Sequence, residues 1–278
     1  MWATPLKARK GMVMKKIAVL LPIINIIGAV LTYLYFSLIL KSNVLHENVP
    51  DYYSPLFFVV GTAVLILCFN MSRRKAVKSL FNVAYGGMEI RSLEESEVYH
   101  LQREALQFPM VVSVITFIVW VLAGFIFGII QPLIASRIFN TEIPNLVDCL
   151  RQFFGIALLG GGVTTLILYF VLENAWRNYI PRFFPEGHLS RVKHVFKLNV
   201  RKRFLVVFIG ITLIPLPVLG MAVYSKMMAL HMADAITRAR IMSSLVKELA
   251  FIVTDSLAIC LILAYFLSKS ISKPLLQI

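Results

Sequence analysis

Asp255 is the residue whose type and position most directly suggest chemistry. It lies in the apolar run 251–258, inside a segment long enough to cross a membrane. On insertion scales a carboxylate at the centre of a membrane helix costs on the order of 2.5–3.5 kcal/mol, so it faces protein or water rather than lipid. Two interpretations follow. Asp255 binds a ligand, ion or proton, or it makes a hydrogen bond to a neighbouring helix in the outer third of the bilayer.

A second group of residues has the chemistry of a soft metal site. Met227, Met228, His231 and Met232 are close in sequence, and thioether and imidazole groups bind copper(I). Methionine is more often a flexible packing residue, which is the interpretation we prefer. The sequence contains no phosphate-binding loop, nucleophile constellation or zinc-ligand motif. We therefore predict no catalytic, cofactor-binding or metal-binding residue in this chain.

The elements that position these residues are predicted to be membrane helices. The chain is 59% apolar and 15% charged, against roughly 25% charged residues in soluble domains. A hydrocarbon layer of about 30 Å needs about 20 apolar residues per helix. Six runs meet this need, which predicts an all-α membrane protein with six transmembrane helices. The runs are 17–40, 53–70, 108–134, 153–172, 204–224 and 249–267.

The distribution of basic residues predicts the orientation of these helices. The N-terminal segment, loops 71–107 and 173–203 and the C-terminal tail hold 21 of the 28 Lys and Arg residues. Basic loops favour the cytoplasmic side of a membrane. Both termini of this multi-pass membrane protein are therefore predicted to be cytoplasmic. The net charge of +14 reflects this topology and contact with anionic lipid heads, and we expect no nucleic-acid partner.

Several small or helix-breaking residues predict how the spans pack. Gly124 and Gly128 have the spacing at which membrane helices approach closely. The run 160–162 consists of three glycines, which weaken or bend the fourth span, and Pro215 and Pro217 interrupt the fifth.

The segment 225–248 lies outside the membrane in this topology, yet it contains neither Pro nor Gly. Apolar residues recur in it at alternating spacings of four and three, which predicts one helix running directly into the sixth span. The stripe is either the seam of a parallel homodimer or a surface that packs on the same subunit. Its members are Met228, Met232, Ala235, Ala239, Met242 and Val246.

The loop 173–203 is predicted to form a cytoplasmic elbow after the fourth span. Pro181, Pro185 and Gly187 interrupt helical structure there. Phe183 and Phe184, with the neighbouring Trp176 and Tyr179, suit the membrane–water interface. The elbow is either an ordinary interfacial anchor or a docking surface for a cytoplasmic domain.

The C-terminal residues 268–278 follow the sixth span without a loop. Leu267, Ile271, Pro274 and Ile278 are spaced by four, three and four, which is typical of a helix that leaves a membrane and enters a coiled coil. A Pro-Leu pair at this place resembles the first helix of a HAMP domain, a dimeric four-helix relay. We therefore expect residues 1–267 to form the transmembrane sensor and anchor domain, and 268–278 to begin a truncated HAMP domain. The candidate signal-coupling residues are Asp255, Ser270, Ile271, Pro274, Leu275 and Ile278.

The whole pattern of six spans, short outer loops, elbow 179–187 and HAMP entry is similar to the membrane part of bacterial class III adenylate cyclases. The resemblance implies a receptor in the bacterial inner membrane that passes a membrane-derived signal through the sixth helix to a cytoplasmic cyclase of the same polypeptide. ATP and a divalent metal would be needed only in that omitted cyclase domain. Because the short outer loops leave no room for a ligand-binding domain, a lipid-like ligand is expected. A histidine kinase or phosphatase is an alternative output, and a small-solute transporter or channel is an alternative of another class.

Overall fold

The computed structural model describes residues 6–36, 50, 53, 56–57, 59–60, 80, 82–84, 90, 93–140, 142–185, 200–231 and 233–275. All the regular elements in these ranges are helices. They are α1 (Leu6–Leu34), α4 (Glu95–Phe125), η3 (Ile126–Ile130), α5 (Gln131–Ile138), α6 (Leu146–Phe154), η4 (Gly155–Gly162), α7 (Val163–Trp176), α8 (Ile180–Phe183), α9 (Val200–Leu213), α10 (Pro215–His231) and α11 (Ala235–Leu275). The two η elements are π-helical turns that continue their neighbouring α-helices into long rods.

The described residues contain four helical segments that are long and apolar enough to cross a membrane. They contain the predicted spans 108–134, 153–172, 204–224 and 249–267, and Leu20–Leu34 forms a shorter apolar helix within the first predicted span. The second predicted span, 53–70, lies mostly outside the described residues. The four segments are Glu95–Ile138, Leu146–Trp176, Arg201–His231 and Ala235–Ser268. The fold is therefore helical and has the character of a membrane protein.

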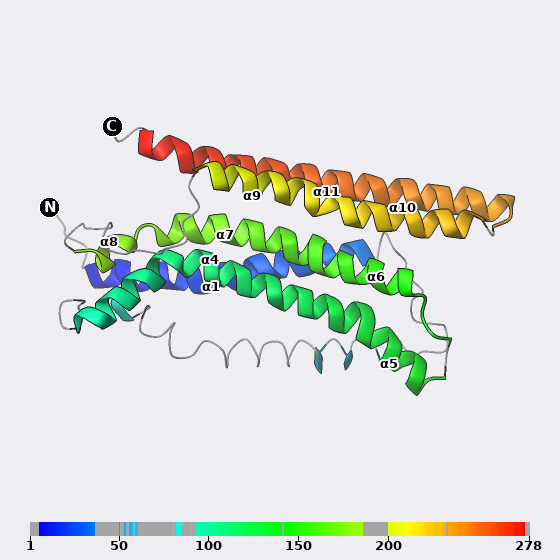
Figure 1. Ribbon diagram of the computed structural model, residues 1–278, viewed down its shortest axis with the longest axis horizontal. Coiled ribbons are helices and arrows are strands. Elements are labelled where there is room, and N and C mark those ends of the chain that lie inside the picture. The colour runs from blue at the N-terminus through cyan, green and yellow to red at the C-terminus, as the bar shows by residue number, and fades with distance from the viewer. Residues whose placement is uncertain are drawn as a thin grey trace.

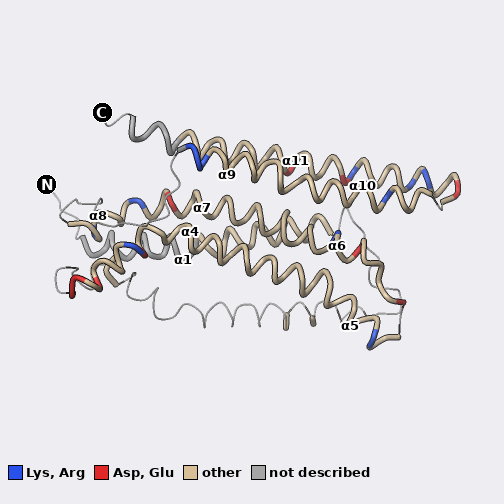
Figure 2. Tube along the Cα trace, in the orientation of Figure 1, with Lys and Arg blue, Asp and Glu red and all other residues tan. Residues whose placement is uncertain are grey.

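The long helices lie roughly parallel to one axis (Figure 1). Helices α1 and α4 and the pair α9–α10 run in one direction, and the rod α6–η4–α7 and helix α11 run in the other. The first residues of α1 and the last of α11 lie at one end of the bundle, together with α8; we call this the terminal end. The turn between α10 and α11 lies at the opposite end, the hairpin end. Charged residues of the described segments gather mostly toward these two ends, and the middle of the bundle is largely without charge (Figure 2). This charge distribution is the one that an apolar membrane interior requires.

The segment after Pro215 differs from the prediction of one helix across residues 225–248. Instead, α10 ends at His231 and α11 begins at Ala235, so the two helices form an antiparallel hairpin. Asp234 explains the break, because its side chain accepts a hydrogen bond from the Thr237 backbone N–H at 3.2 Å and caps α11. Hydrogen bonds from the side chain and from the backbone N–H of Thr237 lower the pKa of the exposed Asp234 carboxyl. The prediction of one continuous helix rested on the apolar stripe and did not include this cap.

Backbone contact between α1 and the rod η4–α7 positions the hairpin end of α1. A Cβ at Gly28 would lie 1.9 Å from Thr164 Oγ1, and a Cβ at Gly160 would lie 2.3 Å from Thr32 Oγ1. Each helix thus contributes a glycine that receives a threonine from the other. We call these four residues the glycine–threonine crossing. Close approach of this kind is how small residues join membrane helices.

The predicted glycine pair of the third span also marks a helix crossing. Gly124 lies against Phe153 and Ala157, and Gly128 lies against the backbone of Phe153. The contact joins the rod α4–η3 to α6 and η4, and it confirms the prediction of close approach. The predicted interruption of the fifth span is confirmed as well, because α9 ends at Leu213 and α10 begins at Pro215.

Candidate functional site

An ion pair between Arg151 on α6 and Glu248 on α11 is buried among the helices near the hairpin end. Arg151 is 5% exposed and Glu248 is 0% exposed. The guanidinium donates from Nε to Glu248 Oε1 at 3.3 Å and from Nη2 to Oε2. The paired contact uses the planar fork of the guanidinium, which fixes the orientation of both side chains as well as their distance.

Tyr35, at the hairpin end of α1, completes the contact. Its hydroxyl donates to Glu248 Oε1 at 2.7 Å, and the side chain is fully buried. Glu248 therefore accepts three hydrogen bonds, one from α1 and two from α6. Tyr35 itself belongs to an apolar cluster that includes Leu159, Val218 and Ile252. A carboxylate in such surroundings is tolerated because its charge is paired and its oxygens are hydrogen-bonded.

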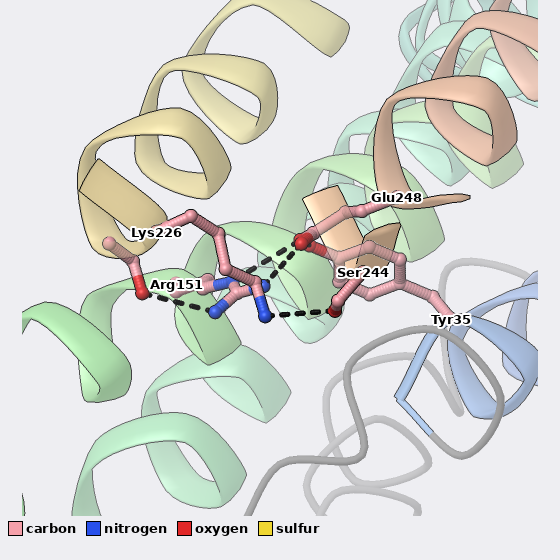
Figure 3. Close-up of polar contacts among 6 residues, drawn as sticks. Tyr35, Arg151, Lys226, Ser244 and Glu248 are labelled. Carbon is pink, nitrogen blue, oxygen red and sulfur yellow. Dashed lines mark hydrogen bonds and ion pairs between the residues drawn. The ribbon is translucent and has the colours of Figure 1, made fainter. Parts of the chain in front are cut away.

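Residues of the α10–α11 hairpin extend the contact. Arg151 Nη1 donates to Ser225 Oγ at 3.1 Å, and Lys226 Nζ donates to Ser244 Oγ at 3.0 Å. Figure 3 shows these side chains converging from different helices. We call the whole set the polar cluster, and it joins α1, α6, α10 and α11. Its members are Tyr35, Arg151, Ser225, Lys226, Ser244 and Glu248.

Neither Arg151 nor Glu248 was among the predicted site residues. Each lies one or two residues outside a predicted apolar span, 153–172 and 249–267, and was assigned to an outer loop. A usable signal was present, because the two residues have opposite charge and the predicted topology places them at the same depth. Pairing charges at equal depth on different spans would have proposed the contact.

Asp255, the predicted intramembrane acid, lies on α11 seven residues after Glu248 and therefore on nearly the same helix face. Buried residues of this face, Ile252 and Ile259, precede and follow it. Asp255 is partly buried, and within the described part of the chain it has no hydrogen-bond or salt-bridge partner. Its interpretation as an interhelical hydrogen bond therefore has no support from these residues.

The predicted dimer stripe is divided between the two helices of the hairpin. Met228 lies on α10, whereas Ala235, Ala239, Met242 and Val246 lie on α11. These five side chains are exposed, and Met232 lies outside the described residues. The face by which α11 packs in the bundle is a different one, which contains Glu248. Packing of the α11 stripe on the same subunit is therefore not seen.

The predicted elbow residues contribute to the core at the terminal end. Phe183 and Phe184 are buried with Trp176 and Tyr179, while Pro181 and Pro185 are exposed. Gly187 lies outside the described residues. The aromatic side chains pack against residues of α4 in one core cluster. The two predicted roles of the elbow, as an interfacial anchor or as a docking surface, stay predictions.

Polar contacts fix the elbow to α4 and to the segment 82–84. Trp176 Nε1 donates to the Ala105 carbonyl at 2.7 Å, and Gln102 Nε2 donates to the Phe183 carbonyl at 2.8 Å. Arg182 donates to the Ala84 carbonyl and lies over the Tyr179 ring. Burial raises the pKa of the Tyr179 hydroxyl, although Arg182 partly offsets the effect.

The remaining predicted residues lie at the C-terminal end of α11. Ser270, Ile271, Pro274 and Leu275 belong to its helical backbone, and Ile278 lies outside the described residues. The sixth predicted span thus continues without interruption as far as Leu275. Within the described ranges, no group of three or more His, Cys, Asp or Glu residues is arranged to hold a metal ion. Comparison with known proteins gives no relative, because no family model, curated protein or solved structure matches the chain.

Proposed function

We propose that the chain is the membrane input and anchor module of a signal-transduction protein, and that α11 carries the signal. The observation that supports this is the continuity of α11 from Ala235 to Leu275. One helix contains Glu248 of the polar cluster, the partly buried Asp255 and the residues that resemble a HAMP entry. Events at the hairpin end can therefore reach the terminal end through a single element.

The dimensions of α11 suit this role. At 1.5 Å per residue, about 40 Å of helix separates Glu248 from Leu275, which exceeds the thickness of the hydrocarbon layer. A continuous helix that moves as a body displaces both of its ends together. No relay of side chains through other spans is required.

The proposed orientation places both termini and the elbow in the cytoplasm of a bacterium, with six spans in the inner membrane. The proposed effector is a class III adenylate cyclase attached through HAMP, and a histidine kinase or phosphatase is the alternative. The exposed apolar faces of α9–α11 suit a stimulus that is itself a lipid-like molecule. ATP and a divalent metal would then bind only in the effector.

A fusion tests transmission through α11. The chain through Ile278 is joined to the rest of a HAMP domain and a class III cyclase domain, with two or seven residues inserted at the junction. An insertion of two helical residues rotates the effector by about 200° around the axis of α11, whereas an insertion of seven residues returns it to nearly its original orientation. We expect the two-residue insertion to change basal cyclase activity by at least about fivefold, the lower end of ordinary allosteric coupling, and the seven-residue insertion to restore it.

The same insertions placed in the exposed loop at 142–145 serve as the control, because they leave the phase of α11 unchanged. Cyclase activity that is indifferent to the junction insertions would contradict transmission by helix orientation.

We further propose that the module is a homodimer joined along the exposed stripe of α11. In a background without native cysteines, oxidation of single cysteines at 239, 242 and 246 should give disulfide-linked dimers. Cysteines at 237 and 244, on the other side of α11, should crosslink weakly because a helical seam repeats every three to four residues. Equal crosslinking at all five positions would remove the argument for a seam.

A further inference from the structure

The buried ion pair fixes the position of Glu248 in a way that the neighbouring apolar contacts do not. After Glu248 in the chain, α11 packs on the bundle through four buried residues, Ile252, Ile259, Leu263 and Leu267. Apolar contacts are not directional, so they permit a helix to shift or rotate with little loss. The fork of Arg151 and the hydroxyl of Tyr35 hold Glu248 in one place instead. The polar cluster therefore defines the register of α11 against α1 and α6.

We propose that Arg151, Glu248 and Tyr35 form a latch that holds α11 in one of two registers, and that opening this contact changes the signal at the C-terminal end. The proposal rests on the proposed function for its output and on the contact geometry for its mechanism. A buried ion pair contributes little net stability compared with apolar residues of the same size, yet its geometry can specify one arrangement. Such a contact suits a switch better than it suits a permanent joint.

The latch is bordered by polar groups of the α10–α11 hairpin. Ser225 accepts from the remaining guanidinium nitrogen, and the Lys226 ammonium donates to Ser244 beside it. Arg151 and Glu248 come from elements that lie far apart in the chain and are not joined by a loop. Separation of the two would move α11 and the hairpin without unfolding α6. Four helices meet at this point, and the contact involves the only helix that continues to the C-terminal residues.

A second ion pair in the described part of the chain provides a matched control. Arg203 on α9 donates to Glu173 on α7, and the two residues are 16% and 19% exposed. This pair joins two other helices near the terminal end and does not involve α11. Both helices also pack against α11, but the pair itself includes no residue of α11, so its removal tests whether the loss of any ion pair is enough to change the register of the output helix.

Three variants open the latch to different degrees. Tyr35→Phe removes one of the three hydrogen bonds to Glu248 and no charge. Glu248→Gln removes the ion pair but keeps the shape of the side chain. Arg151→Met combined with Glu248→Leu removes both charges and fills the site with apolar groups, so this variant folds even if the single charge removal does not. The control variant is Arg203→Met combined with Glu173→Leu.

The first measurement follows α11 directly, without any effector. A cysteine replaces the fully buried Ile252, one turn from Glu248, in the full chain without native cysteines. Its rate of reaction with a water-soluble maleimide is measured in lipid nanodiscs. We expect the rate to rise by about tenfold in the double variant, which corresponds to a shift of 1.4 kcal/mol between registers. Tyr35→Phe should give a smaller rise, and the control variant should give none.

The second measurement is basal cyclase activity of the fusion with the same variants. Altered activity in the double variant, with normal activity in the control variant, supports the latch. An unchanged labelling rate in a folded double variant overturns it, because α11 then keeps its register without the polar contact. Faster labelling with unchanged activity leaves the latch in place and overturns transmission through α11, which separates the failure of the two proposals.

Discussion

Replacement of Arg151 by methionine is expected to lower the free energy of unfolding by about 3–5 kcal/mol, because the Glu248 carboxylate then remains buried without its counter-charge. Glu248→Leu should be about as costly, since it leaves the Arg151 guanidinium buried without its counter-charge. The double variant should cost much less than the sum of the two, because no unpaired charge remains. SDS titration of the protein in mixed micelles, followed by circular dichroism, measures all three values.

The size of the coupling between the two substitutions is the informative quantity. Residues in one ion-pair network couple by about 0.5–3 kcal/mol or more, whereas distant residues are additive. Arg203→Met supplies the comparison, because its partner Glu173 is partly exposed and water can solvate the charge that remains. We expect a smaller loss there. Additive costs for Arg151 and Glu248 would contradict the contact that the structure shows between them.

Gly160→Ala should destabilise the protein by about 1–3 kcal/mol, as overpacking of a tight interface usually does. The new methyl group would lie 2.3 Å from Thr32 Oγ1 and 2.5 Å from the ring of Trp120. Neither neighbour is a flexible chain end that can move aside. The helix α1 must therefore separate from η4, and the glycine–threonine crossing opens. The same SDS titration measures the loss.

Gly220→Ala is the control for this prediction. Gly220 lies on α10, and a Cβ there has nothing within 4 Å. Because alanine is favoured over glycine in a helix by about 0.8–1.0 kcal/mol, this substitution should be neutral or stabilising. The two substitutions are chemically identical, so opposite signs can come only from the surroundings. Destabilisation of equal size at both positions would show that packing at the crossing is not the cause.

Much of the helical architecture could be predicted because it depends on local pattern. Apolar runs located the four long spans of the described residues, and the glycine pair at Gly124 and Gly128 located a crossing. The proline at 215 marked a helix boundary. Each of these features follows from residues close together in the chain. The hairpin break at Asp234 was missed because an apolar stripe outweighed one capping residue, although the cap is also a local signal.

The polar cluster is different, because its pairing is a property of the tertiary structure. Arg151 and Glu248 are 97 residues apart, and Tyr35 and Glu248 are 213 residues apart. The residues next to either one in the chain do not identify the other, and the only link in the sequence is the predicted topology that places both at the same depth. The burial of the elbow aromatics also depends on the tertiary structure. Their composition suits an interface and a core equally, and their packing against α4, where Trp176 donates to the Ala105 carbonyl, could not be read from the sequence.

The glycine–threonine crossing joins α1 to the rod that contains α6, and it leaves the α10–α11 hairpin outside this contact. Gly28 and Gly160 bring α1 and η4 into backbone contact, and α6 continues into η4 without a break. The crossing therefore lies a few turns from the place where Tyr35 and Arg151 meet Glu248, and it joins the helices that lead to both residues. In the proposed latch, the part that changes position is then the α10–α11 hairpin. A substitution that loosens the crossing would weaken the contact between the two partners of Glu248, so under the proposal neither register of α11 would be firmly held.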